Sequence, residues 1–154
     1  TDQEYLQTQF PEAYSQGNHS SMAWAVVDGS IIKQLKDAEK HLILQPMTSA
    51  PELRTYLSEH GFAVKQEQAV QDGDHIYTVM QAEYDPEHVQ TGQVFPYIGI
   101  LKADSDENKA YIQQQCSRLQ KRINGLRQSG KQEALANQTE QILEQIQQVL
   151  SQAE

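Results

Sequence analysis

Short apolar runs alternate with helix-like segments between residues 22 and 84, and this alternation restricts the folds that the chain can adopt. The runs at residues 22–27 and 42–44 are apolar at every position, as in strands buried on both faces of a sheet. Residues 31–40 and 51–60 have apolar side chains at helical spacing. Two strand-like runs follow at residues 62–70 and 75–83, and Asp72 and Gly73 between them favour a hairpin turn. The pattern predicts an α/β fold with parallel crossovers between the first three strands and an antiparallel final pair.

From about residue 104 the apolar spacing becomes that of a coiled coil. Two seams alternate steps of four and three residues: Ile112, Cys116, Leu119, Ile123 and Leu126 in the first, and Leu135, Thr139, Ile142, Ile146 and Val149 in the second. Ser129 and Gly130 mark the turn between two arms of about 20 residues, each about 30 Å long. Leu143 and Leu150 widen the second seam, so that arm can touch more than its partner arm.

These patterns predict two domains. The first is an α/β domain at residues 1–101, whose polar segment at 1–21 receives no assignment. The second is a C-terminal antiparallel coiled-coil helical hairpin at residues 102–154.

The charge pattern of the hairpin points to two interpretations. The chain has a net charge of −9, which argues against an even basic coat for nucleic acid but not against a local basic face. Every charged residue between positions 109 and 131 is basic, whereas the second arm carries Glu133, Glu140 and Glu144. Either opposite charges set the pairing of the arms, or the first arm binds RNA phosphates. The RNA-binding candidates are Lys109, Arg118, Lys121 and Arg122.

Other classes of site are not indicated. Cys116 is the only cysteine, which excludes an internal disulfide and fits a reducing, cytoplasmic compartment. The five histidines lack metal-ligand spacing, no run of about 18 apolar residues predicts a membrane span, and no nucleophile or phosphate-binding motif identifies a catalytic residue. Asp28 and Gly29 follow the first strand, and Gln45 and Pro46 follow the second. Loops at the carboxyl ends of parallel strands are common ligand sites, so these four residues are the positional candidates.

The run LILQP at residues 42–46 resembles the bacterial TrmK family. The likeness continues through Leu53, Arg54, Tyr56 and Leu57, the run EHGF at residues 59–62, the Asp-Gly hairpin, and the run FPYI at residues 95–98. With the closing helical hairpin it covers about residues 38–150. Members of this family are S-adenosylmethionine-dependent methyltransferases that act on N1 of an adenine in tRNA.

The resemblance implies part of a class I methyltransferase-like, Rossmann-like sheet, with S-adenosylmethionine as cofactor and tRNA as partner. It places Gln45 and Pro46 at the rim of the cofactor site, although Met47 stands where the family has asparagine. Residues 1–21 are too short to supply the family's N-terminal half, which carries the cofactor loop. We therefore expect cofactor binding only together with that missing half.

Two functions follow from this expectation. The first is the C-terminal part of a tRNA adenine-N1 methyltransferase, in which the hairpin assists tRNA binding. The alternative is a non-catalytic interaction or dimerisation module derived from a methyltransferase, which would form a homodimer through the helical hairpin.

Overall fold

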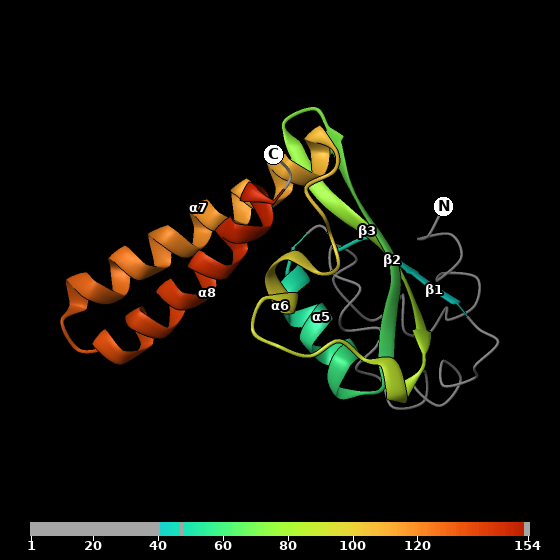
Figure 1. The fold of residues 1–154 in the computed structure, drawn as a ribbon, viewed down its shortest axis with the longest axis horizontal. Helices are drawn as coiled ribbons and strands as arrows, with labels where there is room; N and C mark the ends of the chain where they lie inside the picture. Colours follow the sequence, from blue (N-terminus) through green and yellow to red (C-terminus); the bar gives the residue numbers. More distant parts are fainter. Residues whose placement is uncertain (1–40, 47, 153–154) are drawn as a thin grey trace, which may run out of the picture. The chain divides into compact units, whose positions relative to one another are not determined.

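The computed structural model describes residues 41–46 and 48–152, which form two compact units (Figure 1). Within the described residues, the first unit comprises residues 41–68 and 77–100, and the second comprises residues 69–76 and 101–152. The strand predicted at residues 22–27 and the helix predicted at 31–40 lie outside the described part of the chain, as do Asp28 and Gly29.

The first unit is built on a sheet of three strands, β1 (His41–Leu44), β2 (Phe62–Asp72) and β3 (His75–Tyr84), in the order β1-β3-β2. β1 is antiparallel to β3, with Leu42 opposite Ala82 and Leu44 opposite Met80. A two-residue turn joins β2 to β3, so these strands are antiparallel as well. β1 and β2 therefore run in the same direction, as predicted, but the hairpin places β3 between them.

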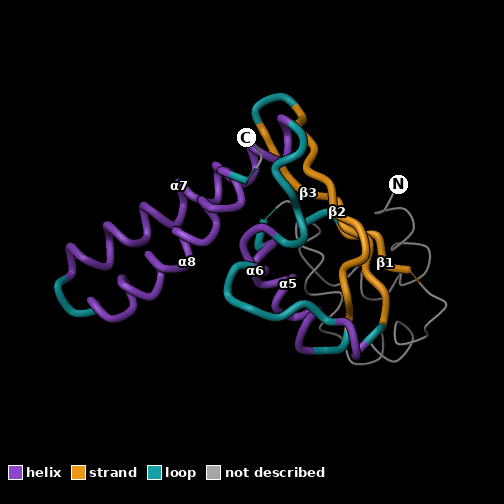
Figure 2. The backbone as a smooth tube through the Cα atoms, viewed as in Figure 1, coloured by secondary structure: helices purple, strands orange, loops and turns teal. Residues whose placement is uncertain are grey.

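One face of this sheet is covered by the helices α5 (Ala50–Glu59) and α6 (Phe95–Ile98), which lie side by side (Figure 2). Leu53 and Leu57 of α5 and Phe95 of α6 are buried in the core of this unit. The strands contribute the residues of their inward face: Leu42, Leu44, Phe62, Val64, Met80 and Ala82.

Two local features of this unit depend on the backbone at single residues. Residues 95–98 form the helical turn α6, and Pro96 sits in its first turn, where a proline costs no hydrogen bond. Ser49 precedes α5 but does not cap it with its side chain. Its backbone is left-handed, with φ of 61°, whereas a capping serine needs an extended backbone to reach the first amides.

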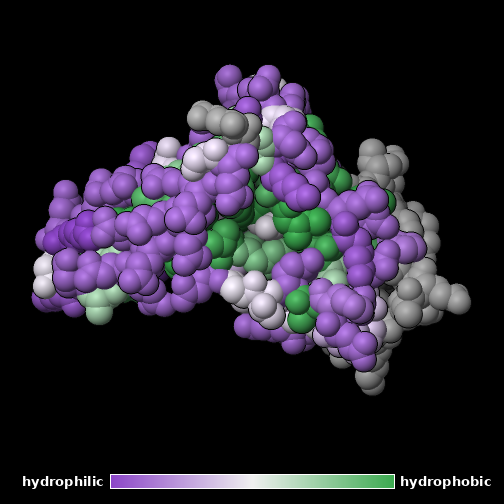
Figure 3. All heavy atoms as spheres, in the orientation of Figure 1, coloured by the Kyte–Doolittle hydropathy of each residue, from purple (hydrophilic) through white to green (hydrophobic). Residues whose placement is uncertain are grey.

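The second unit contains the predicted helical hairpin, formed by α7 (Asp106–Ser129) and α8 (Glu133–Ser151). Ile112 and Ile123 of α7 and Ile146 of α8 are fully buried, as the coiled-coil spacing predicts. Among the predicted seam residues, Cys116, Leu126 and Val149 are half-buried and only Leu135 is exposed, at 37%, while its neighbour Ala136 is fully buried. On the face shown in Figure 3, the surface of the hairpin is mostly hydrophilic.

Asn108 joins three parts of the second unit. Its Oδ1 accepts a hydrogen bond from the backbone N–H of Ala69 at 2.9 Å, and its Nδ2 donates to the carbonyl of Lys102 at 3.0 Å and to Asp104 at 2.9 Å. The Asn108 side chain is buried, so these bonds replace the water that the amide would otherwise bind. They tie the base of α7 to the tip of the β2–β3 hairpin within this unit.

Candidate functional site

Three cations of α7 share one exposed side of the helix. Lys121 and Arg122 follow Arg118 by three and four residues, which places all three on neighbouring turns of one face. All three side chains are exposed, and none forms an ion pair within the described chain. We call Arg118, Lys121 and Arg122 the basic face. Its charge is uncompensated locally, since α7 has no acidic residue beyond its first turn.

The other cations of α7 lie elsewhere. Lys109 and Arg127 are each nine residues from Arg118, which is two and a half turns and therefore the opposite side of the helix. Arg127 donates a hydrogen bond to Glu140 at 2.8 Å and lies 3.6 Å from Glu133, both on α8. The bond to Glu140 raises the pKa of Arg127. Lys109 is half-buried and does not belong to the basic face.

The two interpretations of the charge pattern therefore apply to different residues. Arg127 pairs the arms through α8, so its positive charge is already matched by carboxylates. The basic face points away from the seam between the arms and leaves three cations accessible to solvent. Such an arrangement can bind a chain of phosphates.

The candidate cofactor residues lie where β1 ends. Gln45 is half-buried and Pro46 is buried directly after Leu44, the last residue of that strand. Because β2 runs in the same direction as β1, this corner is at the carboxyl-end edge of the sheet. Only part of the Gln45 side chain is accessible there, and Pro46 offers no hydrogen-bond donor.

A fully buried ion pair in the first unit escaped the sequence analysis. Nη2 of Arg54 on α5 lies 2.6 Å from Oε2 of Glu67 on β2, and both side chains are 0% exposed. Arg54 also donates to the carbonyl of Pro96 at 3.0 Å and to Thr78 Oγ1 at 3.3 Å. The N–H of Ile100 donates to Glu67 Oε1 at 3.3 Å. This buried network holds α6 and the residues after it against α5 and the sheet.

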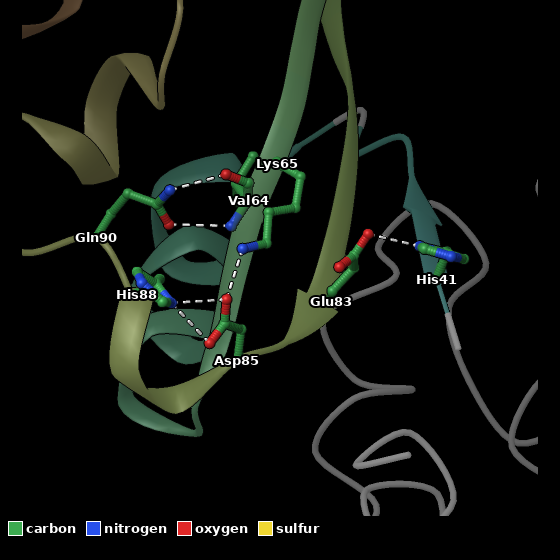
Figure 4. Close-up of polar contacts among 7 residues, drawn as sticks. All are labelled: His41, Val64, Lys65, Glu83, Asp85, His88 and Gln90. Atoms are coloured by element: carbon green, nitrogen blue, oxygen red, sulfur yellow. Dashed lines mark hydrogen bonds and ion pairs between the residues drawn. The ribbon is translucent and has the colours of Figure 1, made fainter. Parts of the chain in front are cut away.

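A second polar cluster surrounds the end of β3 (Figure 4). Asp85 accepts hydrogen bonds from Lys65 at 2.6 Å and from His88 at 2.9 Å. The bond from Lys65, followed by that from His88, lowers the pKa of Asp85, so this carboxylate stays ionised and is unsuited to donate a proton near neutral pH. Its contribution to stability is present above the ordinary carboxyl range and is lost as the pH falls through the lowered pKa. The Gln90 side chain bonds to both backbone groups of Val64, on β2, at 3.0 and 2.8 Å.

The cysteine is not a candidate nucleophile either. Cys116 lies half-buried on α7, and burial raises the pKa of its thiol. A protonated thiol is a poor nucleophile at neutral pH. The described residues contain no cluster of three or more potential metal ligands. None of the described helices combines the length and apolar character needed to cross a membrane.

Comparison with known proteins matches residues 27–152 to one family model, TrmK, described as tRNA (adenine(22)-N(1))-methyltransferase. The match spans both described units and the greater part of the chain. The chain belongs to the TrmK family. No curated protein matches the chain.

Solved structures similar to the chain carry the same fold. A Streptococcus agalactiae protein of the NADB-Rossmann superfamily is 21% identical, with a TM-score of 0.63 over 84% of this chain and 54% of that one. TrmK from B. subtilis, an M1A22 tRNA methyltransferase, is 20% identical, with a TM-score of 0.53 over 85% and 57%. TrmK from M. capricolum, solved with S-adenosyl-homocysteine, is 16% identical, with a TM-score of 0.52 over 81% and 56%.

These structural similarities concern the fold of the two units and not their chemistry. At such identities they establish the fold: a mixed α/β unit with a small antiparallel sheet, and a helical pair, matching part of Rossmann-like methyltransferase structures. The chain spans little more than half the length of these structures. Roles for Gln45, Pro46 and the cations of α7 therefore remain predictions.

Proposed function

We propose that this chain acts as part of a tRNA methyltransferase that transfers a methyl group from S-adenosylmethionine to N1 of adenosine 22. The observation that carries the proposal is the TrmK family match, which extends over residues 27–152. The M. capricolum relative was solved with the cofactor product, which supports the same cofactor here. S-adenosylmethionine would supply the methyl group, and the chain's own contribution would be to position the RNA and one edge of the cofactor site.

The described residues divide this work between the two units. In the first unit, the half-buried Gln45 at the carboxyl end of β1 would contact the cofactor at the rim, with the buried Pro46 fixing the turn. Asp28 and Gly29, the other positional candidates, lie outside the described residues. In the second unit, the basic face of α7 would hold the tRNA backbone, while Arg127 fixes the arms to each other. Lys109, half-buried on the opposite side, contributes least.

Methyl transfer tests the enzymatic proposal directly. The natural polypeptide that carries this sequence should label an unmodified tRNA transcript with a radioactive methyl group from S-adenosylmethionine. A transcript with guanosine in place of adenosine 22 should remain unlabelled. If calorimetry finds no binding of millimolar S-adenosylmethionine and no label is transferred, the enzymatic proposal is wrong.

Salt dependence tests the role of the basic face. Arg118→Ala combined with Lys121→Ala should weaken tRNA binding and lower the slope of log K against log salt by about 2, because two phosphate contacts are lost. Arg127→Ala is the matched control: it also removes an exposed cation of α7, but one whose charge is already paired with Glu140. Its slope should equal that of the unmodified protein. Equal slopes for all three proteins would show that the basic face is an ordinary solvated helix surface that does not contact the phosphates of tRNA.

A further inference from the structure

Gly125 occupies an unusual position in α7. It lies along the helix away from both ends, on the exposed surface. A Cβ atom added there would have no heavy atom within 4 Å. Glycine is the poorest helix former after proline, so an exposed interior position would ordinarily favour almost any other residue. Neither a positive φ nor a close neighbour requires glycine here, unlike Gly99 of the first unit. Its presence therefore calls for a reason outside the fold.

The helical repeat places Gly125 within the basic face. It follows Lys121 by four residues and Arg122 by three, so it lies one turn further along on the same side of α7. It follows Arg118 by seven residues, two turns along. The face thus consists of three long cationic side chains beside a patch of bare helix backbone.

We propose that Gly125 is the point at which the ribose–phosphate backbone of bound RNA approaches α7 most closely. A missing side chain lets another molecule come near the helix backbone, which is a common use of glycine at ligand contacts. The helix-interior N–H of Gly125 is already hydrogen-bonded along α7, so the glycine supplies room and not a donor. The approach brings phosphates between the side chains of Lys121 and Arg122. This inference rests on the proposed role of the basic face in tRNA binding.

Substitutions at Gly125 separate binding from folding, because the two effects have opposite signs. Gly125→Ala and Gly125→Gln should both raise the melting temperature, since each improves helix propensity. Gly125→Gln should nevertheless weaken tRNA binding about fivefold at physiological salt and lower the salt slope by about 1, the effect of one lost phosphate contact. Gly125→Ala should weaken binding less than Gly125→Gln.

Asn124→Ala provides the matched control. Asn124 is exposed and adjacent in sequence, but it points about a quarter turn away and bonds to Gln120 at 3.0 Å. Replacing it by alanine also improves helix propensity, and tRNA affinity should not change. A control variant that loses affinity to the same extent would show that helix stiffness, not access to Gly125, governs binding.

The remaining outcomes distinguish this inference from the function on which it rests. If Gly125→Gln binds tRNA normally while Arg118→Ala with Lys121→Ala weakens binding, the basic face binds RNA and the inference about Gly125 is wrong. If neither protein changes affinity, the proposed role of the basic face fails with it. If Gly125→Gln abolishes self-association of the protein and leaves tRNA binding intact, the bare backbone accommodates a second helix instead, which also overturns the inference.

Discussion

Gly99 packs directly against the buried Arg54–Glu67 ion pair of the first unit and leaves no room for a side chain. Its φ is +60°, and an added Cβ would overlap Oε1 of Glu67 and come within 2.8 Å of Nε of Arg54. Neither partner can move aside easily, because both side chains are fully buried and bonded to each other. Gly99→Ala should therefore lower the free energy of unfolding by about 3–4 kcal/mol, from about 1–3 kcal/mol of strain in a backbone conformation that glycine alone adopts readily and about 1–3 kcal/mol of overpacking. Urea denaturation measures this loss.

Gly73 is the control that isolates the steric part. It has almost the same φ, +59°, but no heavy atom within 4 Å of the added Cβ, since it lies in the turn between β2 and β3. Gly73→Ala should therefore cost only the backbone strain, about 1 kcal/mol. Equal losses for the two variants would mean that the network yields to a methyl group and does not restrain the residues after α6.

This network marks a limit of sequence analysis at the residue scale. Arg54 follows Leu53 on α5, and periodicity predicted the buried stripe of Leu53 and Leu57 but not the arginine beside it. Glu67 lies in the polar run KQEQ, which gives no sign of a buried carboxylate. A buried charge is stable only when its partner is held in place, and that partner comes from another element. Residue types alone could not pair Arg54 with Glu67.

At the scale of the element, two helices begin at a serine, and only one of these serines caps. Ser105 has an extended backbone, with φ of −144°, and its Oγ accepts the N–H of Asn108 at 3.1 Å. Ser49 precedes α5 in a left-handed conformation and makes no such bond. Ser105→Ala should cost about 1 kcal/mol of unfolding free energy, whereas Ser49→Ala should cost almost nothing.

Thermal or urea unfolding of the two alanine variants shows which serine stabilises its helix, and Ser49→Gly provides a third variant for the comparison. Glycine accepts a positive φ without strain, so this variant should be as stable as the unmodified protein or more so. A comparable loss at both serines on replacement by alanine would indicate that Ser49 does cap α5 in solution.

Element types were predictable where a long period was present. The spacing of Ile112, Leu119 and Ile123 gave the seam of α7, and the Asp-Gly pair gave the β2–β3 hairpin. The seam of α8 was misplaced at its first turn, where Ala136 is buried instead of Leu135. The connection between the arms is short, so the smaller side chain fits where the helices must come together. Spacing alone does not reveal such a local demand for size.

For the whole molecule, the negative net charge opposes the proposed binding of tRNA. The net charge of −9 repels a polyanion at long range, so the candidate site was visible only in the distribution of charge along α7. At physiological salt, interactions between exposed charges are screened beyond about 8 Å. The basic face can therefore act on a phosphate at short range despite the acidic remainder of the chain. The candidate cofactor corner offers no such signal, because Gln45 and Pro46 are uncharged.

The two units should also open separately, and Cys116 reports on one of them. It is the only cysteine and lies on α7, and burial raises the pKa of its thiol, so it reacts slowly while the helical unit is closed. Asn108→Ala removes the buried amide that joins α7 to the tip of the β2–β3 hairpin. The loss of about 1–3 kcal/mol should accelerate labelling of Cys116 by a thiol reagent roughly five- to hundredfold.

Arg54→Met provides the comparison, because it disrupts the other unit. It leaves Glu67 buried without its partner and should cost about 3–5 kcal/mol in denaturant, a larger loss than that of Asn108→Ala. Labelling of Cys116 should nevertheless stay near the rate of the unmodified protein, since the contacts of α7 with α8 belong to a unit that does not contain Arg54. If Arg54→Met accelerates labelling as much as Asn108→Ala does, Cys116 becomes accessible only by global unfolding. The strands β2 and β3, which run through both units, would then couple them into one cooperative fold.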